Sequence, residues 1–217
     1  MRTLKGVAIH TTLLVVGCLL VLSMTMVAGT VPLGPRQTYL LTNGDPLALD
    51  SPAIGLASLG LFGGMTIDLY VTGTICYYWD GTTCHIGPSI PWSMAGVFSS
   101  SSNLGPSNTL NRVTGALYSN GSPVFTIPTY IGGLQTDIPQ DFSIVAIASG
   151  QSGPVTQVKI PIGSQYLFVT ANDSFFGDNY STNLELHFKP VPEPSALVTL
   201  GSGLLAIAAL SRRKVVG

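Results

Sequence analysis

The segment "GMTIDLYVTG", Gly64 to Gly73, decides the fold class of this 217-residue chain. Within it, apolar side chains at every second position alternate with Thr66, Asp68 and Tyr70. Because successive side chains of a β-strand point to opposite faces, this period of two predicts a strand with one face in the core.

Further strand-like runs follow along the chain. Leu184, Leu186 and Phe188 alternate with polar residues, and "FSIVAIA" from Phe142 is a compact apolar run that we expect to be buried on both faces. Segments rich in Gly, Pro, Asn and Ser, such as "SSSSNLGPSNT" from Ser99, separate these runs. Short strands joined by such turns predict an all-β fold, an antiparallel β-sandwich of jelly-roll type.

The central part of the chain is acidic. Between residues 29 and 190 there are nine Asp or Glu residues and four Lys or Arg residues, so the formal net charge of this part is 4 − 9 = −5. Binding to a nucleic acid requires clustered Lys and Arg to neutralise phosphates. The charge therefore argues against a nucleic-acid partner.

The N-terminal segment, residues 1–28, has the features of a secretory signal peptide. Arg2 and Lys5 precede an apolar run that is densest between Leu13 and Val27, and the small residue Ala28 follows. This order of a basic, an apolar and a small-residue region predicts an N-terminal signal helix with cleavage after Ala28. An uncleaved N-terminal anchor is the alternative.

The C-terminal segment, residues 191–217, has three parts in a fixed order. A Pro-Glu-Pro motif precedes the apolar run Ala196 to Leu210, which precedes a basic cluster. As a helix, the 15-residue apolar run would span roughly 22 Å, which is less than the bilayer's hydrocarbon core of about 30 Å. A buried core helix is the alternative. The motif and cluster residues are Pro192, Glu193, Pro194, Arg212, Arg213 and Lys214.

This C-terminal combination resembles the PEP-CTERM sorting signal of Gram-negative bacteria. The resemblance implies export through the inner membrane, a transient membrane tether and processing by an exosortase near the Pro-Glu-Pro motif. It also implies a final location at the cell surface or in the extracellular matrix. The predicted organisation is then a signal peptide (1–28), a β-sandwich domain (29–190) and a sorting signal with an apolar helix (191–217).

Two cysteines, Cys76 and Cys84, remain after the predicted cleavage, in "CYYWDGTTC". A hairpin centred on Asp80, with Gly81 in the left-handed conformation, would place the two cysteines opposite each other. In an oxidising compartment such a pair predicts a disulfide. Two free thiols are the alternative.

Catalytic motifs are absent from the sequence: there is no nucleophile elbow, phosphate-binding loop, zinc-protease motif or dinucleotide fingerprint. We therefore expect a protein that is not an enzyme. The segment richest in functional groups is "ANDSFFGDNYSTN", Ala171 to Asn183. Its carboxylates, amides and carbonyls are the hard oxygen donors that Ca²⁺ prefers. Asn, Asp and Gly are also common in turns, so a turn without a ligand is the alternative.

The strand "YLFVT", this loop and the alternating strand after it resemble the calcium-dependent galactophilic bacterial lectins and related jelly-roll domains. The resemblance implies a calcium site in which Asp173, Asp178 and Asn179 supply side-chain oxygens and Phe176 supplies its carbonyl. It also implies that the bound ion contacts sugar hydroxyls. The loop is shorter than that of the lectins, and Tyr180-Ser181 replaces their Ser-Gly.

Two functions compete on this basis. The first is an exported β-sandwich that binds calcium and a surface or matrix polysaccharide. The second is a structural matrix protein whose loops bind no specific ligand.

Overall fold

The structure is a computed structural model that describes residues 27–40, 45–79, 82–85, 93–105, 109–118, 121, 128–131, 134–137, 140–147, 152–192 and 203. The regular secondary structure of the described part is almost entirely β-strand, which confirms the all-β expectation. Its elements are β1 (Gly29–Pro32), β2 (Gln37–Thr38), β3 (Leu49–Asp50), β4 (Ile54–Gly55), the 3-10 helix η1 (Ala57–Leu59), β5 (Thr66–Cys76), β6 (Tyr78–Trp79), β7 (Cys84–His85), β8 (Ser93–Ser99), β9 (Leu117–Tyr118), β10 (Pro128–Ile131), β11 (Leu134–Asp137), β12 (Phe142–Val145), β13 (Thr156–Lys159), β14 (Tyr166–Ala171) and β15 (Tyr180–Val191).

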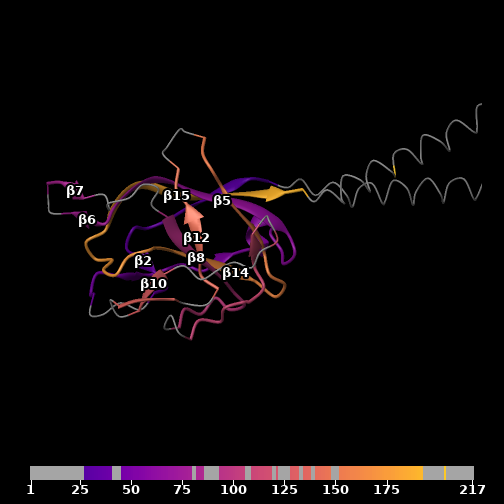
Figure 1. Ribbon diagram of the computed structural model, residues 1–217, viewed down its shortest axis with the longest axis horizontal. Coiled ribbons are helices and arrows are strands. Elements are labelled where there is room, and N and C mark those ends of the chain that lie inside the picture. The colour runs from indigo at the N-terminus through magenta and orange to yellow at the C-terminus, as the bar shows by residue number, and fades with distance from the viewer. Residues whose placement is uncertain are drawn as a thin grey trace, which may run out of the picture.

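Two larger sheets form the body of the molecule. One has the strand order β1-β15-β5-β13-β9, and the other has the order β12-β8-β14-β4. Figure 1 shows β5 and β15 in a layer above β8 and β14. The antiparallel pairs are nested: β1 pairs with β15, β4 with β14, β5 with β13 and β8 with β12. This pairing of outermost with outermost and innermost with innermost strands is the jelly-roll arrangement, so that expectation is confirmed.

The core lies between the two sheets and follows the alternation seen in the sequence. Ile67, Leu69 and Val71 of β5 are fully buried, whereas the residues between them are partly exposed. Leu186 and Phe188 of β15 join the same apolar cluster. In these segments every second side chain therefore packs against the opposite sheet, as predicted.

Burial on both faces occurs in β14 rather than in the run at Phe142. In β12, Phe142 and Ile144 are buried but Ser143 and Val145 are only partly so, because β12 is an end strand of its sheet. The expectation for that run was wrong. Leu167 to Ala171 of β14 are all buried.

The outer face of β14 is covered by the segment around β2 and β3. Thr170 Oγ donates to the carbonyl of Gln37 at 3.1 Å, and Ser51 Oγ donates to the carbonyl of Val169 at 2.8 Å. Residues 37–40 and 45–51 therefore form a third layer over this strand and bring Asp45 toward the end of β14.

The predicted signal helix and C-terminal helix lie outside the described residues, apart from Gly203. Among the residues that the structure describes, no helix is long and apolar enough to cross a membrane.

Candidate functional site

The loop between β14 and β15 crosses from one sheet to the other at one end of the sandwich. β14 ends with Ala171 opposite Met94 of the four-stranded sheet, and β15 begins with Tyr180 opposite Cys76 of the five-stranded sheet. The eight residues between them, 172–179, contain every predicted metal ligand. Both ends of this loop are thus held by strands of the sandwich.

A β-bulge shapes the start of β15. The register shifts between Thr182 and Glu185, so two residues of β15 stand against Gly73 of β5. Gly73 has φ +109°, and a Cβ there would lie 2.5 Å from the carbonyl oxygen of Asn183, so only glycine fits. A bulge bends its strand and increases the local twist. It therefore helps to set the angle at which the loop enters β15.

Phe176 anchors the middle of the loop. Its side chain is fully buried in the core, and its carbonyl accepts a hydrogen bond from the backbone N–H of Asn179 at 3.1 Å. The carbonyl predicted to bind calcium is therefore already used in a turn, with one lone pair left for a second partner.

Asp45 ties the loop to a distant part of the chain. Its Oδ2 accepts hydrogen bonds from the N–H groups of Phe176 and Gly177, both at 2.7 Å, and its Oδ1 accepts one from Leu47 at 3.1 Å. Gly177 permits this approach, because a Cβ there would collide with Asp45 Oδ1. Asp45 was not predicted from the sequence, since no local pattern links "NGDP" to a loop that lies far away in the chain.

The predicted ligand side chains of the loop carry three buried oxygen atoms without a hydrogen-bond partner. They are Asp173 Oδ2, Asp178 Oδ1 and Asn179 Oδ1. The other atoms of two of these side chains are engaged: Asp173 Oδ1 accepts from the N–H of Ser174 at 2.6 Å, and Asn179 Nδ2 donates to the carbonyl of Pro35 at 3.2 Å. A buried acceptor without a donor is costly, which makes these atoms suited to a cation.

The electrostatics of the loop agree with this description. Burial raises the pKa of Asp173 above its ordinary value. The backbone amides of Ser174 and Phe175 and then the side-chain amide of Asn179 oppose the rise, and the charge of Asp178 adds to it. The pKa of Asp178 is also raised, mainly by burial and then by Asp45. On the other side of the loop, burial and then the charge of Asp173 raise the pKa of Tyr77 to about 12. The negative charges of the loop thus disfavour one another.

Of the four predicted ligands, three therefore contribute an unpartnered buried oxygen, and the fourth contributes the carbonyl of the turn. No group of three or more His, Cys, Asp or Glu side chains arranged for a metal occurs among the described residues. The donors in this loop are instead two carboxylates, one side-chain amide and a backbone carbonyl. Such a mixed set of hard oxygens is typical of Ca²⁺ rather than of zinc.

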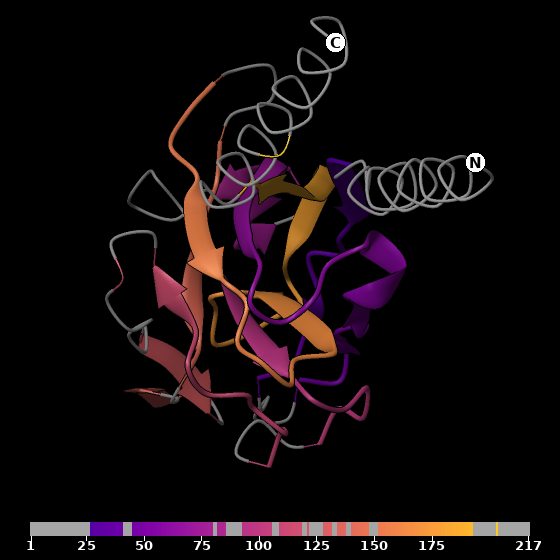
Figure 2. The same cartoon turned by 90° about the vertical axis from the view of Figure 1, so that its right-hand side faces the viewer.

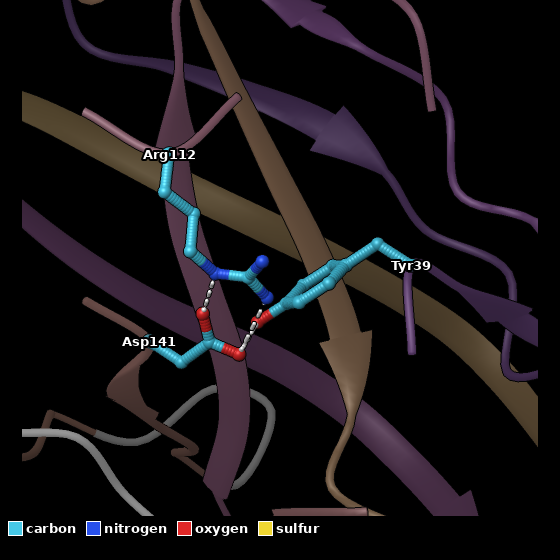
Figure 3. A network of polar contacts seen from close by, with 3 residues as sticks. All are labelled: Tyr39, Arg112 and Asp141. Carbon is cyan, nitrogen blue, oxygen red and sulfur yellow. Dashed lines mark hydrogen bonds and ion pairs between the residues drawn. The ribbon is translucent and has the colours of Figure 1, made fainter. Parts of the chain in front are cut away.

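A second polar cluster lies inside the sandwich and was not anticipated. Arg112 Nε donates to Asp141 Oδ1 at 2.8 Å, and the hydroxyl of Tyr39 donates to Asp141 Oδ2 at 3.2 Å (Figure 3). Burial raises the pKa of Asp141 to about 6, although Arg112 lowers it, and burial raises the pKa of Tyr39 as well. The cluster joins three segments that are distant in the sequence, and its groups satisfy one another, as a structural network does.

The predicted cysteine geometry is wrong in its register. Trp79 of β6, not Cys76, stands opposite Cys84 of β7. The reason is that β5 continues through Cys76, which pairs with Tyr180 of the large sheet instead of joining the hairpin. Cys76 is buried, with 4% of its surface exposed. The disulfide stays a prediction, because the Cys84 side chain lies outside the described part.

Most residues of the terminal signals also lie outside the described part: residues 1–26, Glu193, Pro194, Arg212, Arg213 and Lys214. Pro192, the first residue of the Pro-Glu-Pro motif, is exposed directly after β15.

Comparison with known protein families matches residues 190–214 to the PEP-CTERM protein-sorting motif. This confirms the sorting signal read from the sequence and marks the chain as an exported substrate of an exosortase, with a surface or extracellular destination. Comparisons with curated proteins and with solved structures gave no match.

Proposed function

We propose that this exported jelly-roll protein binds Ca²⁺ in its β14–β15 loop and, through that loop, a polysaccharide of the cell surface or extracellular matrix. The observation that carries the proposal is the set of three buried, unpartnered oxygens on Asp173, Asp178 and Asn179. With the carbonyl of Phe176 they would hold the ion, and water or a ligand would complete its six to eight oxygens.

The surroundings of the loop support a carbohydrate ligand. Phe175, within the loop, and Tyr180, directly after it, expose 44% and 48% of their surfaces, and Leu47, which lies against Gly177, exposes 53%. Aromatic rings offer an apolar face with a polar edge, which suits the faces of sugar rings. A calcium ion held by the loop would offer its remaining coordination positions to sugar hydroxyls.

The wider setting follows from the sorting signal. We propose that the host is a Gram-negative bacterium, that a cleaved signal peptide directs export, and that the apolar run Ala196 to Leu210 tethers the chain in the inner membrane until an exosortase acts. The protein is proposed to bind its ligand without transforming it, since no catalytic arrangement was recognised in the sequence.

A structural matrix role without a ligand is the second candidate. Asp45 favours it, because its carboxylate already holds the loop through the amides of Phe176 and Gly177. In that case the loop would be a fixed turn, and its shape would not depend on a cation.

Thermal unfolding with and without calcium separates the two. At a calcium concentration a hundredfold above Kd, binding stabilises the fold by about 2.7 kcal/mol, which raises Tm by roughly 5–10 °C for a domain of this size. Asp173→Asn and Asp178→Asn should each remove most of this rise, and Asp50→Asn, an exposed carboxylate on β3, should leave it unchanged. A Tm that is insensitive to millimolar Ca²⁺ and to EDTA would refute calcium binding. A glycan array probed with and without EDTA then tests the carbohydrate ligand.

A further inference from the structure

The two ends of β15 mark opposite ends of the sandwich. At one end Tyr180 lies opposite Cys76, next to the candidate calcium loop, and at the other Val191 lies opposite Thr66. Twelve residues of strand at about 3.3 Å each separate these ends by roughly 35 Å. In Figure 1 the yellow arrowhead of β15 points to the right and the β6–β7 hairpin lies at the far left.

The end at which β15 finishes, here called the exit pole, is formed by β1, the start of β5 and the turn after β13. Figure 2 views the molecule from this side. Gly29 of β1 lies opposite Phe188, and Thr66 of β5 lies between Val191 and Lys159. The sorting motif begins at residue 190, so it leaves the domain from this pole.

Exposed apolar side chains gather at the exit pole. Ile162 exposes 86% of its surface and Phe62 exposes 52%. The turns that carry Phe62 and Ile162 are in contact, because a Cβ on Gly63 would lie 2.9 Å from Ile162 Cα. The N–H of Gly64 also donates to the carbonyl of Ile160 at 2.8 Å.

A recess lies beside these residues. It has a volume of about 340 Å³ and is lined mainly by apolar groups, among them Leu56, Leu61, Phe62 and the ring of Tyr166. Single exposed apolar residues are ordinary on protein surfaces, but two on adjoining turns beside an apolar recess indicate a surface with a partner.

Charged side chains also differ between the two ends of the sandwich. Lys159 and Lys189 are exposed at or near the exit pole, and Asp68, which is opposite Lys189 in the sheet, accepts a hydrogen bond from Gln157 at 2.7 Å. Asp173 and Asp178 lie in the loop at the other end of the sandwich. An anionic lipid surface attracts the two lysines of the exit pole.

The short linker after β15 indicates which partner the exit pole contacts. Only residues 192–195 separate Val191 from the apolar run that begins at Ala196. Four residues span at most about 14 Å when fully extended. If that run is held in a bilayer, the exit pole cannot move far from the lipid headgroups.

We propose that, while the chain is tethered by its sorting signal, the exit pole rests on the lipid surface, with Phe62 and Ile162 inserted among the headgroups. This rests on the membrane tether of the proposed function. The domain then stands upright on the membrane, and the β14–β15 loop faces away from it at a height of roughly 35 Å. Exosortase cleavage would release both the tether and this weak contact.

Lipids with brominated acyl chains, which quench nearby tryptophan, give a direct test. The full chain is placed in vesicles of phosphatidylcholine and phosphatidylglycerol, and Phe62→Trp is compared with Phe175→Trp, whose side chain is similarly exposed at the opposite pole. The emission of the parent chain, with its two native tryptophans, is subtracted. We expect brominated lipid to quench the added tryptophan at position 62 at least twofold more than that at position 175.

Two further measurements make the result decisive. Ile162→Trp is a second reporter, should Phe62→Trp not fold, and Ile162→Asp combined with Phe62→Trp should lose most of the quenching. Vesicle flotation reports on the tether alone. Chain that floats but is quenched equally at both positions overturns the proposed contact and leaves the tether intact, whereas chain that does not float overturns both.

Discussion

Asp45 and Phe176, 131 residues apart in the chain, are joined by a hydrogen bond of 2.7 Å from the buried amide of Phe176 to Asp45 Oδ2. The N–H of Gly177 donates to the same oxygen. The segment that covers the outer face of β14 thus also holds the loop after β14. The candidate ligands Asp173, Asp178 and Asn179 are therefore displayed by a loop whose backbone is fixed independently of any ion.

Asp45→Ala should destabilise the fold by about 3 kcal/mol, because it leaves two buried N–H groups without their charged acceptor. Urea denaturation monitored by fluorescence measures the change. Asp50→Ala, which removes an exposed carboxylate from β3, is the matched control and should alter the free energy of unfolding by less than about 0.5 kcal/mol. Equal effects of the two substitutions would show that Asp45 does not hold the loop.

The stabilisation by calcium should depend on pH. Burial raises the pKa values of Asp173 and Asp178, so in ion-free protein their contribution to stability is fully present below the unfolded pKa and is lost as the pH rises through the raised values. Calcium binds the ionised carboxylates. The rise in Tm on adding calcium should therefore be larger at about pH 7.5 than at about pH 4.5, as calorimetry at both pH values would measure. A rise in Tm that is the same at both pH values would mean that calcium binds at another site.

Arg112→Met should cost more at high pH than at low pH. At about pH 8 it leaves the Asp141 carboxylate buried without its ion pair, a loss of about 3–5 kcal/mol. Asp141 has a pKa of about 6, raised by burial, so its contribution to stability is full below the unfolded pKa and disappears as the pH rises through about 6.

At about pH 5 the Asp141 carboxyl is largely neutral, and the same substitution should cost much less. Urea denaturation at the two pH values makes the comparison. Lys189→Met, which removes an exposed cation from β15, should have a small effect at both. A cost for Arg112→Met that does not change with pH would contradict the raised pKa.

Cys76 and Cys84 should be linked in exported protein. The closed loop is short, so the bond would stabilise the fold by about 2–3 kcal/mol in the loop-entropy description. Alkylation of folded, unreduced protein followed by mass spectrometry tests this. Modification of both thiols would exclude the bond. The test is informative because the observed register places Trp79, not Cys76, opposite Cys84.

Mature protein should lack both terminal signals. Mass spectrometry of protein extracted from the cell surface should find an N-terminus near Gly29 and a C-terminus near the Pro-Glu-Pro motif, Pro192 to Pro194. Replacing Arg212, Arg213 and Lys214 with glutamine should cause unprocessed chain to accumulate. Intact residues 195–217 in the mature form would instead indicate a permanent anchor.

What the sequence determined by itself was local. The period of two in Gly64 to Gly73 and around Leu186 was sufficient for the strands and the fold class, because alternation along a strand depends on near neighbours alone. The sorting motif at residues 190–214 was likewise readable, since its three parts are contiguous. The loop residues Asp173 and Asp178 were found by residue type.

Tertiary structure decided the relationships between distant segments. It placed Asp45 against the β14–β15 loop, joined Tyr39 to Arg112 and Asp141, and drew Cys76 into the large sheet opposite Tyr180. None of these has a local signature, because a jelly roll pairs its first strand with its last and its register is set by how whole sheets pack. The β14–β15 loop and the exit pole lie at opposite ends of the domain for the same kind of reason, because β15 runs the length of the sandwich.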